Sequence, residues 1–190
     1  MCTQTNCVHE FFPEMALAQA KELDAYYEKN KAPMGPLHGL PISLKDQLRV
    51  KGLETSMGYI SWLGKYDEED SVLTALLRKA GAVFYVKTSV PQTLMVCETV
   101  NNIIGRTTNP RNKDWSCGGS SGGEGAMIGM RGGVIGVGTD IGTKLRTTSE
   151  TNTNFVHLLF RRIDSRPLGF QLLVWYSSKS RAHALRQDGK

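Results

Sequence analysis

The chain has 190 residues, of which 40% are hydrophobic and 22% charged; this suits one globular domain and leaves little room for a second. No apolar run is long enough for a membrane span, the first residues do not resemble a secretory signal, and the four cysteines lack paired spacing, so we expect a cytoplasmic protein with free thiols. Residues 1–142 carry a net charge of −1 and residues 143–190 one of +6, which argues against a nucleic-acid-binding face on the larger part.

The first predicted element is a helix over residues 14–30. Its apolar residues recur at helical spacing and form one stripe, made of Ala16, Ala20, Leu23 and Tyr27. A short apolar run follows a proline-rich turn at residues 40–46. This run predicts a strand that ends at Lys45, which taken alone is an ordinary solvated lysine at a strand end.

The clearest predicted helix spans residues 67–81. Acidic residues fill its first turn, and Gly81 suits its C-cap. Its expected buried face consists of Val72, Leu73, Leu76, Leu77 and Ala80. Residues 82–88 follow directly and are β-branched and aromatic, which predicts a buried strand. The succession of strand, helix and strand indicates an α/β architecture.

Glycine is concentrated between residues 118 and 142, beside apolar residues that predict a helix near 126–130 and a strand at 133–140. Such density indicates close backbone approach or positive φ at several points, as in a site built from backbone N–H groups. The double serine, Ser120 and Ser121, is consistent with a tight turn that caps a helix. A phosphate-binding loop is excluded, because no lysine follows the glycines in the required GK[ST] pattern.

Five motifs in a fixed order carry a resemblance. They are GPLHGLPISLKD (35–46), KTSVPQ (87–92), GRTTNP (105–110), GGSSGGEGA (118–126) and GVGTDIG (136–142). Together they resemble the amidase signature family over roughly residues 5–142, closest to its eukaryotic acetamidase and fatty acid amide hydrolase types. The resemblance implies a central mixed sheet flanked by helices. It also implies hydrolysis of a small-molecule carboxylic amide to an acid and ammonia or an amine, without a cofactor or a metal.

The resemblance also implies a Ser–Ser–Lys triad in this chain. Lys45 would be the base, which requires burial to lower its pKa, and Ser120 would be a relay serine preceded by a cis peptide bond. An oxyanion hole would come from the backbone N–H groups of one turn, which contains Thr139, Asp140, Ile141 and Gly142. Leu94 would either face the acyl pocket or pack in the core.

The chain departs from the family pattern after Gly142. The nucleophilic serine is expected at position 144, which is occupied by Lys144. With suitable synonymous codons, the bases that encode residues 163–190 read in another frame as a family-like sequence that begins with GSIR. We therefore hypothesise that residues 143–162 are translated intron and residues 163–190 an out-of-frame exon. On this hypothesis, residues 1–142 form a partial amidase domain, and the tail has no native structure.

These departures predict a catalytically inactive chain. The alternative is a non-catalytic relative that binds an acyl amide or a partner subunit. A nucleic-acid-binding function for the basic tail is disfavoured, because the tail contains no zinc, helix-turn-helix or RNP pattern. We also expect residues 83–86 and 134–137 to expose apolar strand faces and to cause aggregation. The oligomeric state is open.

Overall fold

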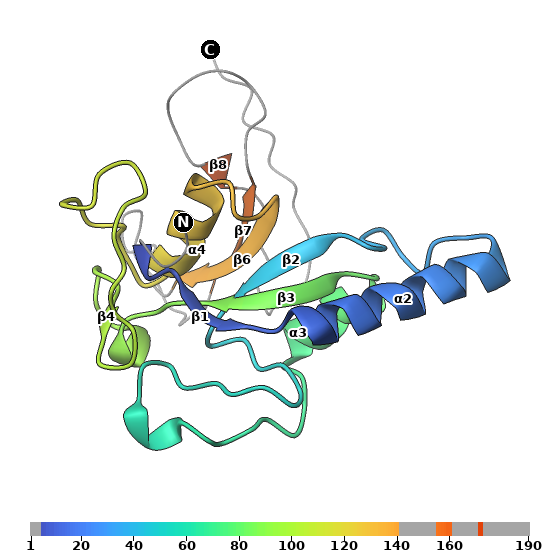
Figure 1. Ribbon diagram of the computed structural model, residues 1–190, viewed down its shortest axis with the longest axis horizontal. Coiled ribbons are helices and arrows are strands. Elements are labelled where there is room, and N and C mark those ends of the chain that lie inside the picture. The colour runs from blue at the N-terminus through green and yellow to red at the C-terminus, as the bar shows by residue number, and fades with distance from the viewer. Residues whose placement is uncertain (1–4, 141–154, 161–170, 173–190) are drawn as a thin grey trace, which may run out of the picture.

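The fold is built on one mixed sheet in the computed structural model, which describes residues 5–140, 155–160 and 171–172 (Figure 1). The six strands that it contains lie in the order β1-β3-β2-β6-β7-β8, and β4 pairs with β5 apart from it. Helices lie against this sheet, which confirms the predicted α/β class. The elements are β1 (Val8–Phe11), α2 (Pro13–Asn30), β2 (Pro41–Lys45), η1 (Ile60–Trp62), α3 (Val72–Lys79), β3 (Val83–Thr88), η2 (Gln92–Leu94), β4 (Val100–Asn101), β5 (Gly105–Arg106), α4 (Gly122–Gly129), β6 (Ile135–Asp140), β7 (Phe155–Phe160) and β8 (Gln171–Leu172).

Three parallel strands bring their carboxyl ends to the same edge of the sheet. Strand β2 lies in the middle, with Lys45 opposite Thr88 of β3 and Leu44 opposite Val137 of β6. Strands β1 and β7 run antiparallel to β3 and β6. Sites in α/β sheets form beyond the carboxyl ends of the parallel strands. The predicted strands that end at Lys45 and Thr88 are confirmed, and both end at this edge.

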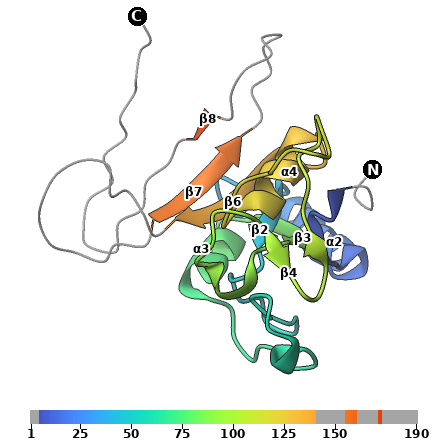
Figure 2. The same ribbon diagram turned by 90° about the vertical axis from the view of Figure 1, so that its left-hand side faces the viewer.

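Different helices cover the two faces of β2. Ile42 and Leu44 belong to a hydrophobic cluster against which two leucines of α3 pack. Ser43 lies on the opposite face, because side chains alternate along a strand, and its hydroxyl donates to Glu124 of α4. Figure 2 shows the strands between α3 and α4. The face that carries Ser43 therefore also carries Lys45, two residues further on.

Helix α2 confirms the first predicted helix. Its C-cap, Lys31, adopts the left-handed conformation with a φ of 52°, and the Lys31 N–H donates to the Tyr27 carbonyl oxygen at 2.7 Å. Ala16 and Leu23 are buried, as the stripe predicts, and pack with Val83. Tyr27 is an exception, since it is 46% exposed. The last turns of α2 extend past the sheet (Figure 1), and the Tyr27 ring there lies beside His38, with ring centroids 6.1 Å apart.

Helix α3 is shorter than predicted, because it begins at Val72 instead of residue 67. Ser71 is its N-cap, and the Ser71 Oγ accepts a hydrogen bond from the Thr74 N–H at 3.4 Å. The acidic residues 67–70 therefore precede the helix. The buried face is also shifted: Thr74 is buried, whereas Val72 and Leu76 are 80% and 47% exposed. The side that meets the sheet carries the other two leucines, so the predicted five-residue face was too wide.

The predicted exposure of the apolar strand faces is wrong for most of β3 and β6. Val83 and Val86 are buried, because α2 covers one and α4 the other. Val137 is buried in the cluster that contains Ile42. Val134, which precedes β6, is 60% exposed, as predicted.

Part of the tail lies on the sheet. Residues Phe155–Phe160 form β7 and pair with all six residues of β6, and β8 pairs with the end of β7. Sequence analysis predicts no native structure for residues 143–190; the other residues of that range lie outside the described ones. The pairing has a simple physical basis, since an edge strand offers unpaired backbone groups to any extended apolar segment. Within the described residues, no helix is long and apolar enough to cross a membrane.

Candidate active site

Lys45 ends strand β2 and has no exposed surface. Its Nζ donates hydrogen bonds to Ser120 Oγ at 2.7 Å, to Thr139 Oγ1 at 2.8 Å and to the Thr139 carbonyl oxygen at 3.1 Å. Lysines are almost never fully buried unless their ammonium group is paired. Here two hydroxyls and a carbonyl oxygen are among its partners. The ordinary interpretation of a solvated lysine at a strand end is therefore wrong.

Ser120 lies immediately before α4 and meets Lys45 from across the sheet edge. The Gly119–Ser120 peptide bond is cis, as the family resemblance implies. Only glycine fits at position 119, because a Cβ there would lie 2.8 Å from the Val96 carbonyl oxygen. Sequence motifs separated by 75 residues thus meet at one hydrogen bond.

Ser121 and Thr139 tie the loop before α4 to the end of β6. The Ser121 Oγ donates to the Thr139 carbonyl oxygen at 2.9 Å and accepts from the Thr139 N–H at 3.1 Å. Neither serine makes a side-chain cap on α4, so the capping interpretation is wrong. The Thr139 N–H is therefore directed at Ser121.

Gln47 joins the same cluster, although no sequence signal marks it. The Thr139 Oγ1 donates to Gln47 Oε1 at 2.7 Å while it accepts from Lys45. The Thr139 hydroxyl therefore links the lysine to a half-buried amide two residues after it in the chain.

The structure describes the predicted oxyanion turn only as far as Asp140. Asp140 is the last residue of β6 and pairs with Phe155 of β7. Ile141, Gly142 and Lys144 lie outside the described residues. Their assignments remain predictions from the sequence.

Leu94 is the last residue of η2, the short helix that follows β3. It has a φ of 62°, is partly buried, and its N–H donates to the Pro91 carbonyl oxygen at 3.1 Å. The described hydrogen bonds tie it to its own turn.

Glu124 is a fully buried carboxyl group in the first turn of α4. Its Oε2 accepts from Ser43 Oγ at 2.7 Å, and its Oε1 accepts from Thr88 Oγ1 at 2.9 Å. Burial raises the pKa of Glu124 to about 7, although these two hydrogen bonds and the charge of Lys45 act in the opposite direction. Sequence analysis missed this residue; an acidic side chain within an apolar helix is the signal that points to it.

A second group of buried ionisable side chains, Asp46, Lys87 and His9, lies next to Lys45 in the chain and on the neighbouring strands. Asp46 follows it directly, is fully buried, and accepts a hydrogen bond from the Met57 N–H at 2.7 Å. Its other carboxyl oxygen lies 3.4 Å from Lys87 Nζ and 3.5 Å from His9 Nε2. Burial lowers the pKa of Lys87, and Asp46 opposes that shift. This group fixes the segment after β2 to β3 and β1.

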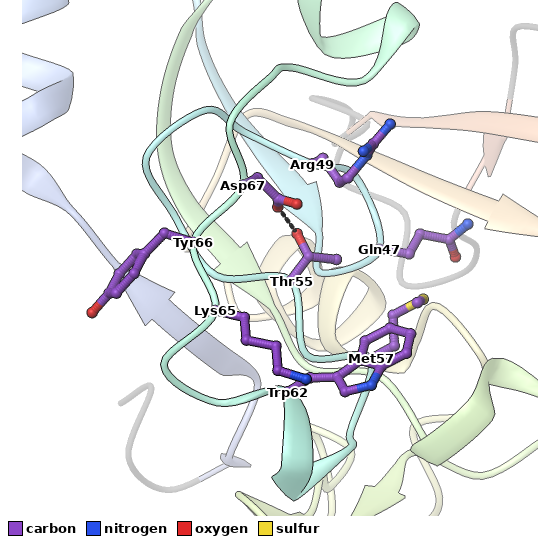
Figure 3. A pocket seen from close by; sticks show the side chains of 8 residues that line it. All are labelled: Gln47, Arg49, Thr55, Met57, Trp62, Lys65, Tyr66 and Asp67. Carbon is purple, nitrogen blue, oxygen red and sulfur yellow. Dashed lines mark hydrogen bonds between the residues drawn. The ribbon is translucent and has the colours of Figure 1, made fainter.

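A pocket of about 350 Å³ opens beside Gln47 (Figure 3). In it, the Thr55 Oγ1 donates to Asp67 Oδ2 at 2.5 Å. Its position next to Gln47 connects it, through Thr139, to Lys45. The residues that line it are Gln47, Arg49, Thr55, Met57, Trp62, Lys65, Tyr66 and Asp67.

The cluster has the parts of a proton-transfer site. A buried amine can accept a proton from a hydroxyl at hydrogen-bond distance when the amine is neutral, and such a hydroxyl can pass on the proton of an attacking group. Ser120 is the hydroxyl in that position.

Comparisons with known proteins agree with this geometry. A family model described as Amidase matches residues 1–147. An acetamidase of Emericella nidulans is 82% identical over 148 residues, which are 78% of this chain and 27% of that protein. An acetamidase of Aspergillus oryzae is 77% identical over the same shares.

Solved structures show the same similarity. A fatty acid amide hydrolase superposes with a TM-score of 0.71 and 48% identity, covering 74% of this chain and 25% of that chain. The peptide amidase of Stenotrophomonas maltophilia gives a TM-score of 0.65 at 29% identity, covering 73% of this chain and 29% of that chain. The chain thus spans about a quarter of the length of the relatives that it matches.

Proposed function

The chain belongs to the amidase family, and on that premise we propose that its described residues form part of an amide-hydrolase site. Lys45 is the base of this site and Ser120 the relay serine. The observation that carries the proposal is the 2.7 Å contact between Lys45 Nζ and Ser120 Oγ, made inside the protein at the carboxyl edge of the sheet. The substrate class is a small carboxylic amide, since the relatives reported above are named acetamidases.

The proposed mechanism is a relay of one proton. A nucleophilic hydroxyl attacks the amide carbonyl and gives its proton to Ser120, while the Ser120 proton passes to neutral Lys45. The proton then returns through the same pair to the leaving nitrogen, which departs as ammonia or an amine. Water hydrolyses the acyl-enzyme by the same route. Backbone N–H groups of the turn after Thr139 would stabilise the oxyanion.

The nucleophilic hydroxyl is the part that this chain does not supply. Position 144, where the family resemblance expects the serine, is a lysine. An ammonium group has no free electron pair with which to attack a carbonyl. We therefore propose that this chain does not turn over amides, although it contains the base and the relay.

A chimera tests the base and the relay directly. Residues 5–140 of this chain would replace the matching segment of the Emericella nidulans acetamidase, which supplies the missing nucleophile. We expect acetamide hydrolysis by the chimera, and a loss of at least about a hundredfold in kcat for Lys45→Ala and for Ser120→Ala. Glu98→Gln, a change at a surface ion pair, is the matched control and should leave kcat unchanged. Full activity of either site variant would refute the assignment.

The unmodified chain tests the missing nucleophile. We expect no acetamide turnover and no labelling by a fluorophosphonate, a reagent that needs a nucleophilic serine. Labelling that Ser120→Ala abolishes would instead make Ser120 the nucleophile.

A further inference from the structure

The face of the sheet that carries Lys45 holds a second titratable group, Glu124. Ser43 and Lys45 are two residues apart on β2 and therefore share a face, and the Ser43 hydroxyl donates to Glu124 at 2.7 Å. Ser120 and Glu124 are four residues apart where the chain enters α4, so one short segment bonds Lys45 through its serine and Ser43 through its carboxyl group.

The surroundings of Glu124 hold it in one place. Hydroxyls of β2 and β3 donate to its two oxygens. On β6, a Cβ at Gly136 would lie 2.0 Å from Glu124 Oε2, so the carboxyl group presses against bare backbone. These contacts place the carboxyl group beside Ser43, on the face of β2 that also carries Lys45.

Among the side chains that the structure describes, Lys45 is the one whose charge acts on Glu124. Strand β3 presents the Thr88 hydroxyl and β6 presents Gly136, and neither carries a charge. The positive charge of Lys45 favours the ionised form of Glu124. Coupling between two binding equilibria is reciprocal, so an ionised Glu124 must favour the ammonium form of Lys45 to the same extent.

We propose that Glu124 is a positioning residue that sets the charge of Lys45, holding the lysine as an ammonium when Glu124 is ionised and releasing it toward the neutral amine when Glu124 is protonated. This role rests on the proposed function, in which only a neutral Lys45 can take the proton of Ser120. Glu124 would then affect proton transfer as well as packing. With its pKa near 7, Glu124 changes charge in the range where a base must work.

The test reads the titration of Lys45 in the full chain. Lysine labelled with ¹³C at Cε reports its charge by NMR, and Lys45→Arg identifies the Lys45 signal by its disappearance. In the unmodified chain we expect a shift of this signal near pH 7, as Glu124 ionises. In Glu124→Gln this step is absent, and the midpoint of Lys45 falls by about one pH unit, a tenfold rise in the neutral amine at a given pH.

Two further variants make the result decisive. Glu98→Gln, which removes a surface carboxyl group, should leave the Lys45 titration unchanged. Thr88→Val removes one donor to Glu124 and should move the step near pH 7 to higher pH; it decides the matter if Glu124→Gln does not fold.

The proposal is overturned if a folded Glu124→Gln chain titrates Lys45 as the unmodified chain does, or if Thr88→Val leaves the step in place. The measurement needs no turnover. A chain without amidase activity can therefore support the proposal, and an active chimera cannot rescue it.

Discussion

At the scale of single residues, Glu124 makes stability depend on pH. Its ordinary pKa of 4.5 applies in the unfolded chain, whereas the buried group titrates near 7. Between these values the folded state binds the extra proton, so the free energy of unfolding falls as pH rises through this window. The pH dependence therefore has a sign opposite to that of a salt-bridged carboxylate.

We predict that Glu124→Gln removes this dependence. Between pH 4.5 and 7 the unmodified chain should lose about 3 kcal/mol of unfolding free energy through this residue, because each pKa unit is worth about 1.4 kcal/mol. Urea titrations at pH 5 and pH 8 measure the difference. Parallel behaviour of the variant and the unmodified chain would show that Glu124 ionises normally.

Gly136 supports the same carboxyl group by leaving space for it. We predict that Gly136→Ala lowers the unfolding free energy by about 1–3 kcal/mol, because its Cβ would lie 2.0 Å from Glu124 Oε2 and 2.5 Å from Ser43 Oγ. Gly125→Ala is the matched control: its Cβ meets nothing closer than 3.9 Å, and alanine is the better helix former. Thermal unfolding should therefore separate the two, with a lower Tm for one and an unchanged or higher Tm for the other.

At the scale of elements, α3 shows which of its leucines hold the fold. Leu77 packs against the cluster on β2 and β3, whereas Leu76 is 47% exposed. We predict that Leu77→Ala costs about 2 kcal/mol and that Leu76→Ala costs less than about 0.5 kcal/mol. If denaturant unfolding shows that both variants lose the same unfolding free energy, the wider buried face that the sequence pattern predicts would be correct.

The elements that the sequence predicted best are those with an unambiguous pattern. The strands ending at Lys45 and Thr88 are continuous apolar runs between turn residues, and both are found in place. The start of α3 was predicted too early, because acidic residues suit the first turn of a helix and a loop before it equally well. The Ser71 cap decides between them only once the backbone is known.

The site was predictable in part for a different reason. Ordered motifs identified Lys45 and Ser120, and the structure brings them together. The bonds of Thr139 to Gln47 and of Glu124 to Thr88 were not predictable, because they join different elements and depend on sheet register and side-chain rotamers. The spacing of residues along the chain indicates neither of these two hydrogen bonds.

At the scale of the whole molecule, the change of pattern after Gly142 has a test in the gene. If residues 143–162 are translated intron, the genomic codons of Gly142 and Arg161 contain the GT and AG of its ends. Some transcripts should then lack the segment between them and encode a serine at position 144. Sequencing of genomic DNA and cDNA across codons 140–165 checks this, and codons without GT and AG at those points would contradict it.

The hydrogen bonds of Lys45 also determine when the site can form during synthesis. Its partners lie 75 and 94 residues further along the chain. On a ribosome the lysine is made early, and its bonds to Ser120 and then to Thr139 can form only after each of those residues has emerged. Closing so long a loop is entropically costly, and contacts of high sequence separation form slowly. The full set of bonds around the amine therefore waits until β6 docks beside β2, which makes assembly of this cluster a late step in the folding of residues 5–140.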